Sequence, residues 1–509
     1  MSLSINLAPL ESESVALAET RPQKVVEFTK NLSHIETFIA ASRLLEELKT
    51  LNRQKIDADT RIQTLELYRK ITHELGHDLE EVYGNAAVPM PDEAKNHAAL
   101  AEAIWLETGY GYKRALLDLK QKLINFQEEK QHSLVILRII EALKNEALVN
   151  YLCYTQPSDA LWSDLHKVYF HALQLGLEDT EVAEHPVGLN SKTINLVYIR
   201  TLLMNLANPQ RLSKTNIRKM SHYVGSLAKF AELRGMGLIE KPMGVFLIEL
   251  DSKKPPVPYL KNRNTPSVET DILLVTVEVA RHIHQQLKYI QESKAQNSEP
   301  LPAAALEVVD EELLKHLIKH FGVATSRAFA RLEKRQAAEV AIGLEAASIL
   351  FRTNKRAKEE ARSYWEVVNT SPDGYAIKTT NLHDIRIAVG ELVSIKESEL
   401  SPWVLGYVVW LITKSQQIEA GIKLLSPSAE SVTVKSPANN IISNALLLPA
   451  IKALNQPVSV ITDSGYLDEN SLAEMKDGNK KSKLKIKQLL ERSACFDRFE
   501  YSLIPEDLS

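Results

Sequence analysis

The sequence predicts an α+β protein of several domains, in which an all-α helical domain precedes a small β-barrel with additional β-strands after it. Three observations support this class. Apolar residues recur at helical spacing through most of residues 25–322. Alternation of the strand type replaces this pattern from Ala338 onward. Short apolar segments separated by turn residues then follow at even spacing, which is typical of a barrel.

Composition narrows the partners and the compartment. The chain has 509 residues and a net charge of −4, so no global basic field attracts nucleic acid and no nucleic-acid partner is expected. Its two cysteines, Cys153 and Cys495, are too few for a disulfide framework. No apolar run is long enough to span a bilayer, and the N-terminus lacks a signal-peptide pattern. A cytoplasmic protein without a membrane span is therefore expected.

The helical half is read as a domain over 25–322, preceded by a flexible polar tail over 1–24. Ser33 and Glu36 have capping-box spacing, which predicts a helix start near Ser33. A second helix is expected from about Asp59. Further helices are expected over residues 94–128, 131–152, 159–176, 189–206, 212–232, 266–293 and 306–321.

Two segments of this half stand apart from the surface helices. Leu134 to Leu148 is apolar around much of its circumference, so this helix is expected in the middle of the domain. Met243 to Leu250 reads as a strand, and Lys253 to Pro258 as an extended loop. No fixed period carries a repeated signature, so a solenoid of standard repeats is not predicted.

The barrel is expected over 325–430, and a C-terminal β extension over 431–509. Barrel strands are predicted from Ala338, at Trp365–Val368, from Tyr375, at Gly390–Ile395, Trp403–Leu411 and Ala420–Leu425. Strands of the extension are predicted at Asn444–Leu448, Pro457–Ile461, Leu484–Leu490 and Phe496–Leu503, with the basic run Lys480–Lys487 on an outer strand face.

Two short motifs in this half carry ligand chemistry. Arg331 and Arg335 form an R-x-x-x-R, and Asn369, Ser371 and Gly374 form an N-x-S-x-x-G. Guanidinium groups bind phosphate through paired hydrogen bonds and stack on purine faces. Asn and Ser offer donors and acceptors to a base edge, and Gly permits close backbone approach. Together these residues predict a site for a planar anionic ligand.

In this order the motifs resemble the signature of the PilZ domain, a six-stranded barrel that serves bacteria as a cyclic di-GMP receptor. Gly406–Trp410 and Gly421–Leu425 resemble the closing strands of that family. The resemblance covers roughly residues 325–430. It implies that Arg331 and Arg335 hold the phosphates and stack on guanine, and that Asn369, Ser371 and Gly374 line the other guanine contact.

Two details complicate the resemblance. Arg327 forms a second R-x-x-x-R with Arg331, so the register of the first motif leaves Arg327 as an alternative ligand-binding residue. Asp373 stands where many family members have glycine, and its carboxylate would lie near an anionic ligand.

A third motif suggests different chemistry. His73, Glu74 and His77 form an H-E-x-x-H, which places both histidines on one helical face with Glu74 as a potential base. A zinc hydrolase needs a third ligand and a substrate cleft, and neither is evident nearby. A helix with polar histidines is the simpler interpretation.

The sequence thus predicts a non-enzymatic bacterial receptor for cyclic di-GMP. It predicts no catalytic residue, no metal and no cofactor, and it predicts a protein partner bound through the helical domain. The alternative is an interaction scaffold whose PilZ barrel has lost nucleotide binding, which Asp373 favours. A zinc metalloenzyme at His73 and His77 is the remote alternative.

Overall fold

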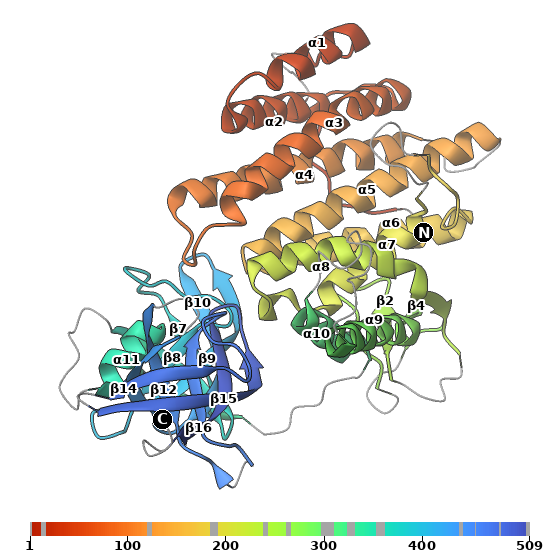
Figure 1. The fold of residues 1–509 in the computed structure, drawn as a ribbon. Coiled ribbons are helices and arrows are strands. Elements are labelled where there is room, and N and C mark those ends of the chain that lie inside the picture. Colours follow the sequence, from red (N-terminus) through yellow and green to blue (C-terminus); the bar gives the residue numbers. More distant parts are fainter. Residues whose placement is uncertain are drawn as a thin grey trace. The chain divides into compact units, whose positions relative to one another are not determined.

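The computed structural model describes residues 3–11, 17–119, 125–183, 192–237, 243–260, 266–296, 310–322, 331–352, 362–436, 441–452, 455–477 and 480–504. The chain forms two compact units, which we treat separately. Helices dominate the first unit and strands the second (Figure 1). None of the helices in the described part of the chain is both long and apolar enough to cross a membrane.

The first unit is a stack of helices in which chain neighbours pack on one another from α2 to α8, while α1 packs on α3 (Figure 1). As expected for Leu134 to Leu148, α5 is buried around most of its circumference. The helices are α1 (Pro22–Leu32), α2 (Thr37–Arg53), α3 (Ala58–Tyr83), α4 (Asp92–Asp118), α5 (Phe126–Leu152), α6 (Asp159–Leu175), α7 (Ile194–Leu206) and α8 (Lys214–Leu227).

The first helix boundary differs from the prediction. Ser33 is the C-cap of α1, and it does not begin a helix. Glu36 is itself the N-cap of α2, and its carboxylate accepts hydrogen bonds from the backbone N–H groups of Phe38 and Ile39. The capping-box prediction was wrong because an acidic side chain can occupy the N-cap position without a serine three residues earlier.

The expected flexible tail is partly held against the helices. Asn6 donates a side-chain hydrogen bond to Asp164 over 2.9 Å, and the backbone N–H of Glu11 donates to the carbonyl of Arg53 over 2.9 Å. Backbone and amide contacts of this kind produce no apolar periodicity, so they could not be predicted from the pattern of residues.

A small sheet completes the first unit. Its strands are β1 (Glu232–Gly235), β2 (Val245–Glu249), β3 (Val257–Pro258) and β4 (Asp271–Val275), in the order β1-β4-β2-β3. β2 confirms the strand predicted at Met243–Leu250. The helix predicted over 266–293 is wrong at its start, because β4 occupies that part and α9 (Val277–Gln296) follows. α10 (Glu311–Gly322) lies within the helix expected over 306–321 except at its last residue.

The second unit contains two closed six-stranded barrels. The first consists of β5 (Leu332–Ile342), β6 (Ser363–Ser371), β7 (Gly374–Thr379), β8 (Leu392–Lys396), β9 (Val404–Lys414) and β10 (Gln417–Ser426), with α11 (Leu344–Arg352) after β5. The second consists of β11 (Glu430–Lys435), β12 (Ile442–Leu448), β13 (Ser459–Asp463), β14 (Leu472–Asp477), β15 (Lys480–Arg492) and β16 (Phe496–Ile504).

Both barrels have the same strand order. If the strands of each are numbered one to six along the chain, the closed order is 1-2-3-6-5-4 in both, and every pairing is antiparallel. The C-terminal strands therefore close a barrel of their own, which goes beyond the extension that the sequence predicted.

One apolar cluster joins the two barrels. It combines Leu344 and Ala347 of α11 with residues of the first barrel, such as Leu405, and of the second, such as Ile461 and Phe496.

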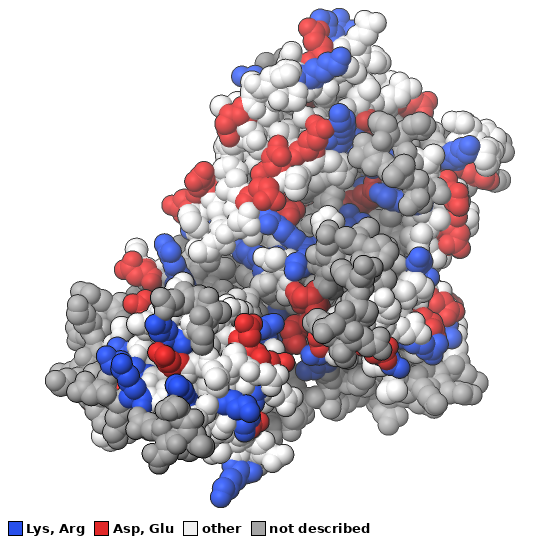
Figure 2. Space-filling view, in the orientation of Figure 1, with Lys and Arg blue, Asp and Glu red and all other residues white. Residues whose placement is uncertain are grey.

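Acidic and basic side chains are interspersed on the face of the molecule shown in Figure 2.

Candidate functional site

The two arginines of the first motif lie at the start of the first barrel. Arg331 directly precedes β5, and Arg335 lies within this strand. Both side chains are exposed, and neither makes a hydrogen bond or ion pair with another described residue. A β-bulge between Glu333 and Gln336 interrupts the pairing of β5 with β6. Because a bulge bends a strand locally, it re-aims the side chains beside it, including that of Arg335.

The register of β5 and β6 brings the second motif to the first. Glu333 pairs with Asn369, and Leu332 pairs with Thr370. The same register, continued by one residue, sets Arg331 opposite Ser371. Residues more than thirty positions apart in the chain therefore meet at one edge of the barrel.

The hairpin between β6 and β7 fixes the position of Ser371. Ser371 pairs with Gly374 across a two-residue turn, and its hydroxyl donates to Asp373 Oδ1 over 2.6 Å. A Cβ atom on Gly374 would overlap the carbonyl oxygen of Ile422 on β10. Glycine is thus required here because β7 and β10 approach each other closely.

The cation between the two arginines is already engaged. Lys334 Nζ lies 2.5 Å from Glu397 Oε2. Burial opposes ionisation of Glu397, but hydrogen bonds from Lys334 and Tyr375 lower its pKa below the usual range. Burial, together with Glu397, raises the pKa of Tyr375 to about 12. Sequence reasoning missed this trio, because Glu397 and Tyr375 belong to no motif. Lys334 is thus paired, whereas Arg331 and Arg335 make no ion pair with another described residue.

The closing strands of the barrel pack as the quoted motifs imply. Gly421 on β10 pairs with Trp410 on β9, and a Cβ on Gly421 would overlap the indole ring. A Cβ on Gly406 would lie 2.6 Å from the carbonyl oxygen of Lys423, which is also too close. The glycines and the tryptophan therefore serve packing between β9 and β10.

The remaining candidates divide as follows. Arg327 lies outside the described residues. His73 and His77 lie on α3, where His73 packs against Trp105 with ring centroids 5.1 Å apart, and burial lowers the pKa of His73 to about 4. Within the described ranges no three His, Cys, Asp or Glu side chains are grouped so that they could hold a metal ion. The zinc alternative thus lacks a third ligand in this part of the chain.

Comparison with known proteins assigns all three parts of the chain to related models. Residues 23–237 match the model "Cyclic-di-GMP receptor FimW, N-terminal domain". Residues 245–351 and 348–431 match "Cyclic-di-GMP receptor FimW, middle PilZ domain", and residues 431–504 match "FimW C-terminal beta-barrel domain". The middle match begins at β2, well before the barrel itself.

A curated protein matches over the same extent. It is named Cyclic-di-GMP receptor FimW, from Pseudomonas aeruginosa, and it is 20% identical over an alignment that covers 98% of this chain and 93% of the relative. The PilZ resemblance seen in the sequence is confirmed by the middle model, and the order of a helical domain, a PilZ barrel and a further barrel is shared.

Proposed function

We propose that this chain, which belongs to the family of three-domain proteins described by the FimW models, is a receptor for cyclic di-GMP that has no catalytic activity of its own. The observation that carries this proposal is the meeting of Arg331 and Arg335 with Asn369 and Ser371 at the β5–β6 edge. Both arginines are exposed and have no partner among the described residues.

The chemistry of these residues suits a cyclic dinucleotide. Each guanidinium can grip a phosphate oxygen through two N–H groups and lie flat on a guanine ring. The Asn369 amide and the Ser371 hydroxyl can pair with the donor and acceptor edge of the base. No step in this arrangement breaks or forms a covalent bond, so we assign no catalytic residue, metal or cofactor.

We further propose that the helical unit carries the output. It is the larger unit and would bind a protein partner in the cytoplasm, where both free cysteines would remain reduced. Ligand binding would then change how the helical unit stands to the barrels, to the extent that cyclic di-GMP binds one arrangement more tightly. Identical small-angle scattering profiles with and without saturating ligand would rule out a large rearrangement.

Calorimetric titration with cyclic di-GMP tests the site. We expect Arg331→Ala and Arg335→Ala each to weaken binding by roughly tenfold to a hundredfold, because each removes charged hydrogen bonds worth about 1.5–3 kcal/mol. Lys485→Ala is the matched control, since Lys485 is an exposed cation on β15 of the second barrel with no side-chain partner among the described residues. Wild-type protein that gives no heat with cyclic di-GMP would contradict the receptor assignment.

A specific contact favours the second candidate, an interaction scaffold without nucleotide binding. The Ser371 hydroxyl already donates to Asp373, so the ligand must compete for it, and the carboxylate repels phosphate. If the scaffold assignment holds, neither the wild type nor Asp373→Asn binds cyclic di-GMP, while both keep the folded barrel by circular dichroism.

A further inference from the structure

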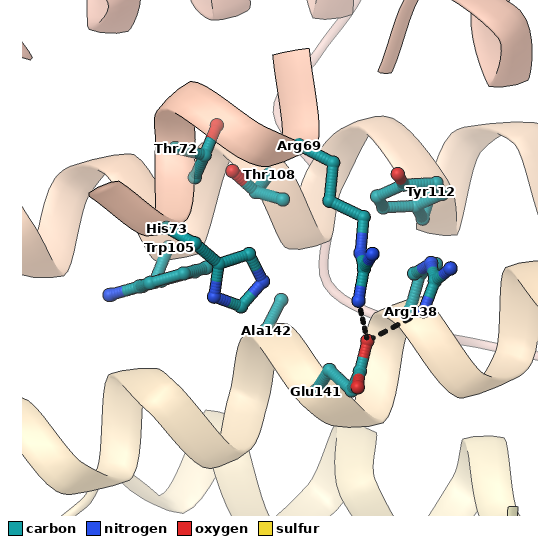
Figure 3. A pocket seen from close by; sticks show the side chains of 9 residues that line it. All are labelled: Arg69, Thr72, His73, Trp105, Thr108, Tyr112, Arg138, Glu141 and Ala142. Atoms are coloured by element: carbon teal, nitrogen blue, oxygen red, sulfur yellow. Dashed lines mark hydrogen bonds and ion pairs between the residues drawn. The ribbon is translucent and has the colours of Figure 1, made fainter. Parts of the chain in front are cut away.

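A buried carboxylate in the helical unit binds several cations and leaves little room for a ligand. Glu141 on α5 lies 2.9 Å from both Arg138 Nη1 and Lys192 Nζ. Arg69 Nη2 lies 3.6 Å from the same carboxylate, and Figure 3 shows the two arginines converging on it. The hollow beside them has a volume of about 20 Å³, which holds about one water molecule. This cluster therefore neutralises its own carboxylate, and its hollow admits no ligand larger than water.

Glu397 of the first barrel also binds several groups, but it does so directly beside the proposed nucleotide site. It follows β8, the strand that pairs with β5. Glu397 Oε2 lies 2.5 Å from Lys334 Nζ, and the Glu397 backbone carbonyl accepts a hydrogen bond from Gln336 Nε2 over 2.8 Å. Tyr375 of β7 also hydrogen bonds to the carboxylate. The side chain and the main chain of one residue thus hold two residues of β5.

The two residues that Glu397 holds flank Arg335 in the sequence. Burial alternates along this part of β5, where Lys334 and Gln336 are half-buried and Arg335 is exposed. Because successive side chains of a strand point to opposite faces, anchoring Lys334 and Gln336 on one face directs Arg335 to the other. Arg335 makes no hydrogen bond or ion pair with another described residue. The direction of its side chain therefore depends on how its neighbours are held.

The strand ladder supports this part of β5 weakly. The register of β5 with β6 shifts between Glu333 and Gln336, and a bulge of this kind disrupts the ladder and leaves a residue unpaired. On the other side, the pairing of β5 with β8 begins only at Glu339. Arg335 thus lies where ladder hydrogen bonds fix the main chain least. The contacts of Glu397 replace part of the missing ladder there.

We propose that Glu397 is a positioning residue for the cyclic di-GMP site, because it holds the bulged start of β5 so that Arg335 is presented to the ligand. This inference rests on the proposed receptor function, since it concerns the same site. Glu397 is not expected to bind the nucleotide itself. Its carboxylate is engaged by Lys334, and a negative charge would repel phosphate. Its contribution to affinity must therefore pass through Arg335.

Two substitutions that change the charge in opposite directions separate positioning from simple electrostatics. Glu397→Gln removes a negative charge beside the site, and Lys334→Met removes a positive one. If charge alone mattered, the first would tighten the binding of cyclic di-GMP and the second would weaken it. Positioning predicts that both weaken binding, because both break the same ion pair. We expect a loss of roughly fivefold to tenfold for each variant in calorimetric titration of the full chain.

A double-mutant cycle tests whether Glu397 acts through Arg335. In the Arg335→Ala background, Glu397→Gln should change the affinity by less than about twofold, because the side chain that it positions is absent. A general loss of stability would instead weaken binding equally in both backgrounds. Glu339→Gln is the matched control and should bind like the wild type. Glu339 lies on β5, its side chain is 20% exposed against 22% for Glu397, and it pairs with Arg362 over 2.8 Å.

Hydrogen exchange of the ligand-free protein tests the anchoring without any nucleotide. Glu397→Gln should speed exchange at the bulge, over residues 333–338, and Glu339→Gln should leave this segment closer to the wild type. Faster exchange in Glu397→Gln, when the wild type does not bind cyclic di-GMP, would confirm the anchoring and contradict only the receptor assignment. Unchanged exchange, tighter binding by Glu397→Gln, or equal losses of affinity in both backgrounds would overturn the positioning role.

Discussion

The two barrels share a strand order and differ in every feature that concerns the ligand. The first has exposed arginines at its first strand, a two-residue turn between its second and third strands, and a Gly421–Trp410 contact between its last two. In the second barrel, residues 449–458 separate the second and third strands, and β15 and β16 contain neither glycine nor tryptophan. A fold alone therefore does not make a receptor, since the proposed site consists of a few residues at one edge of the first barrel.

The second barrel is stabilised by a buried, hydrogen-bonded carboxylate and by two buried phenylalanine side chains. Asp497 is fully buried, and it accepts hydrogen bonds from Arg492 and from the backbone N–H of Gly465. Phe496 and Phe499 of the same strand fill the shared apolar cluster and the core of the second barrel, respectively. These contacts indicate a barrel built to pack against its neighbour.

The largest expected effect concerns the junction between the barrels. Phe496→Ala should cost about 3–5 kcal/mol of unfolding free energy, because Phe496 is fully buried in the cluster that both barrels share. Hydrogen exchange should then rise in both barrels. The control Phe499→Ala should raise exchange mainly in the second barrel, whose core it fills. If Phe496→Ala leaves the first barrel unchanged, the barrels are stabilised independently.

A matched pair of glycine substitutions separates stability from binding. Gly374→Ala should cost about 1–3 kcal/mol, because its Cβ would overlap the Ile422 carbonyl, and should abolish cyclic di-GMP binding by shifting the turn that carries Ser371. Gly465→Ala in the second barrel should cost about 1–2 kcal/mol, because Gly465 has a φ of 73°. Cyclic di-GMP binding should survive Gly465→Ala. Urea unfolding measures the loss of stability in each variant, and calorimetry measures its binding of cyclic di-GMP. Loss of binding in both variants would show that the two barrels act together on the ligand.

The smallest expected effect concerns the residue that departs from the PilZ pattern. Asp373→Asn should tighten cyclic di-GMP binding by roughly twofold to fivefold, because it removes an exposed negative charge beside the site at a gain of about 0.5–1 kcal/mol. The change should shrink at high salt, since exposed charges are screened. Weaker binding by Asp373→Asn would mean that the carboxylate helps to hold Ser371 in its binding orientation.

Particular residues show where sequence reasoning succeeded and where it stopped. The strands at Trp365–Val368 and Trp403–Leu411 were predictable because one barrel face is buried, which enforces alternation. The strand β4 was not, because a short apolar run such as Asp271–Val275 fits a strand or a buried helix equally well. The closure of the second barrel depends on long-range pairing, such as β11 with β14, which no local pattern encodes.

The residues of the candidate site could be predicted from the sequence, but their positions relative to one another could not. The motifs named Arg331, Arg335, Asn369 and Ser371, but their meeting depends on the register of β5 with β6 and on the bulge within it. The salt bridge of Lys334 with Glu397 joins side chains 63 positions apart, so it carries no sequence signal.

Hydrogen exchange of the full chain with and without saturating cyclic di-GMP tests the central claim most directly, because it reports on both barrels at once. The account predicts slower exchange at the start of β5 and in the β6–β7 hairpin, over residues 331–340 and 366–376, with no change in β11 to β16. Protection confined to the second barrel, or none in either barrel at ligand concentrations that saturate binding, would contradict it.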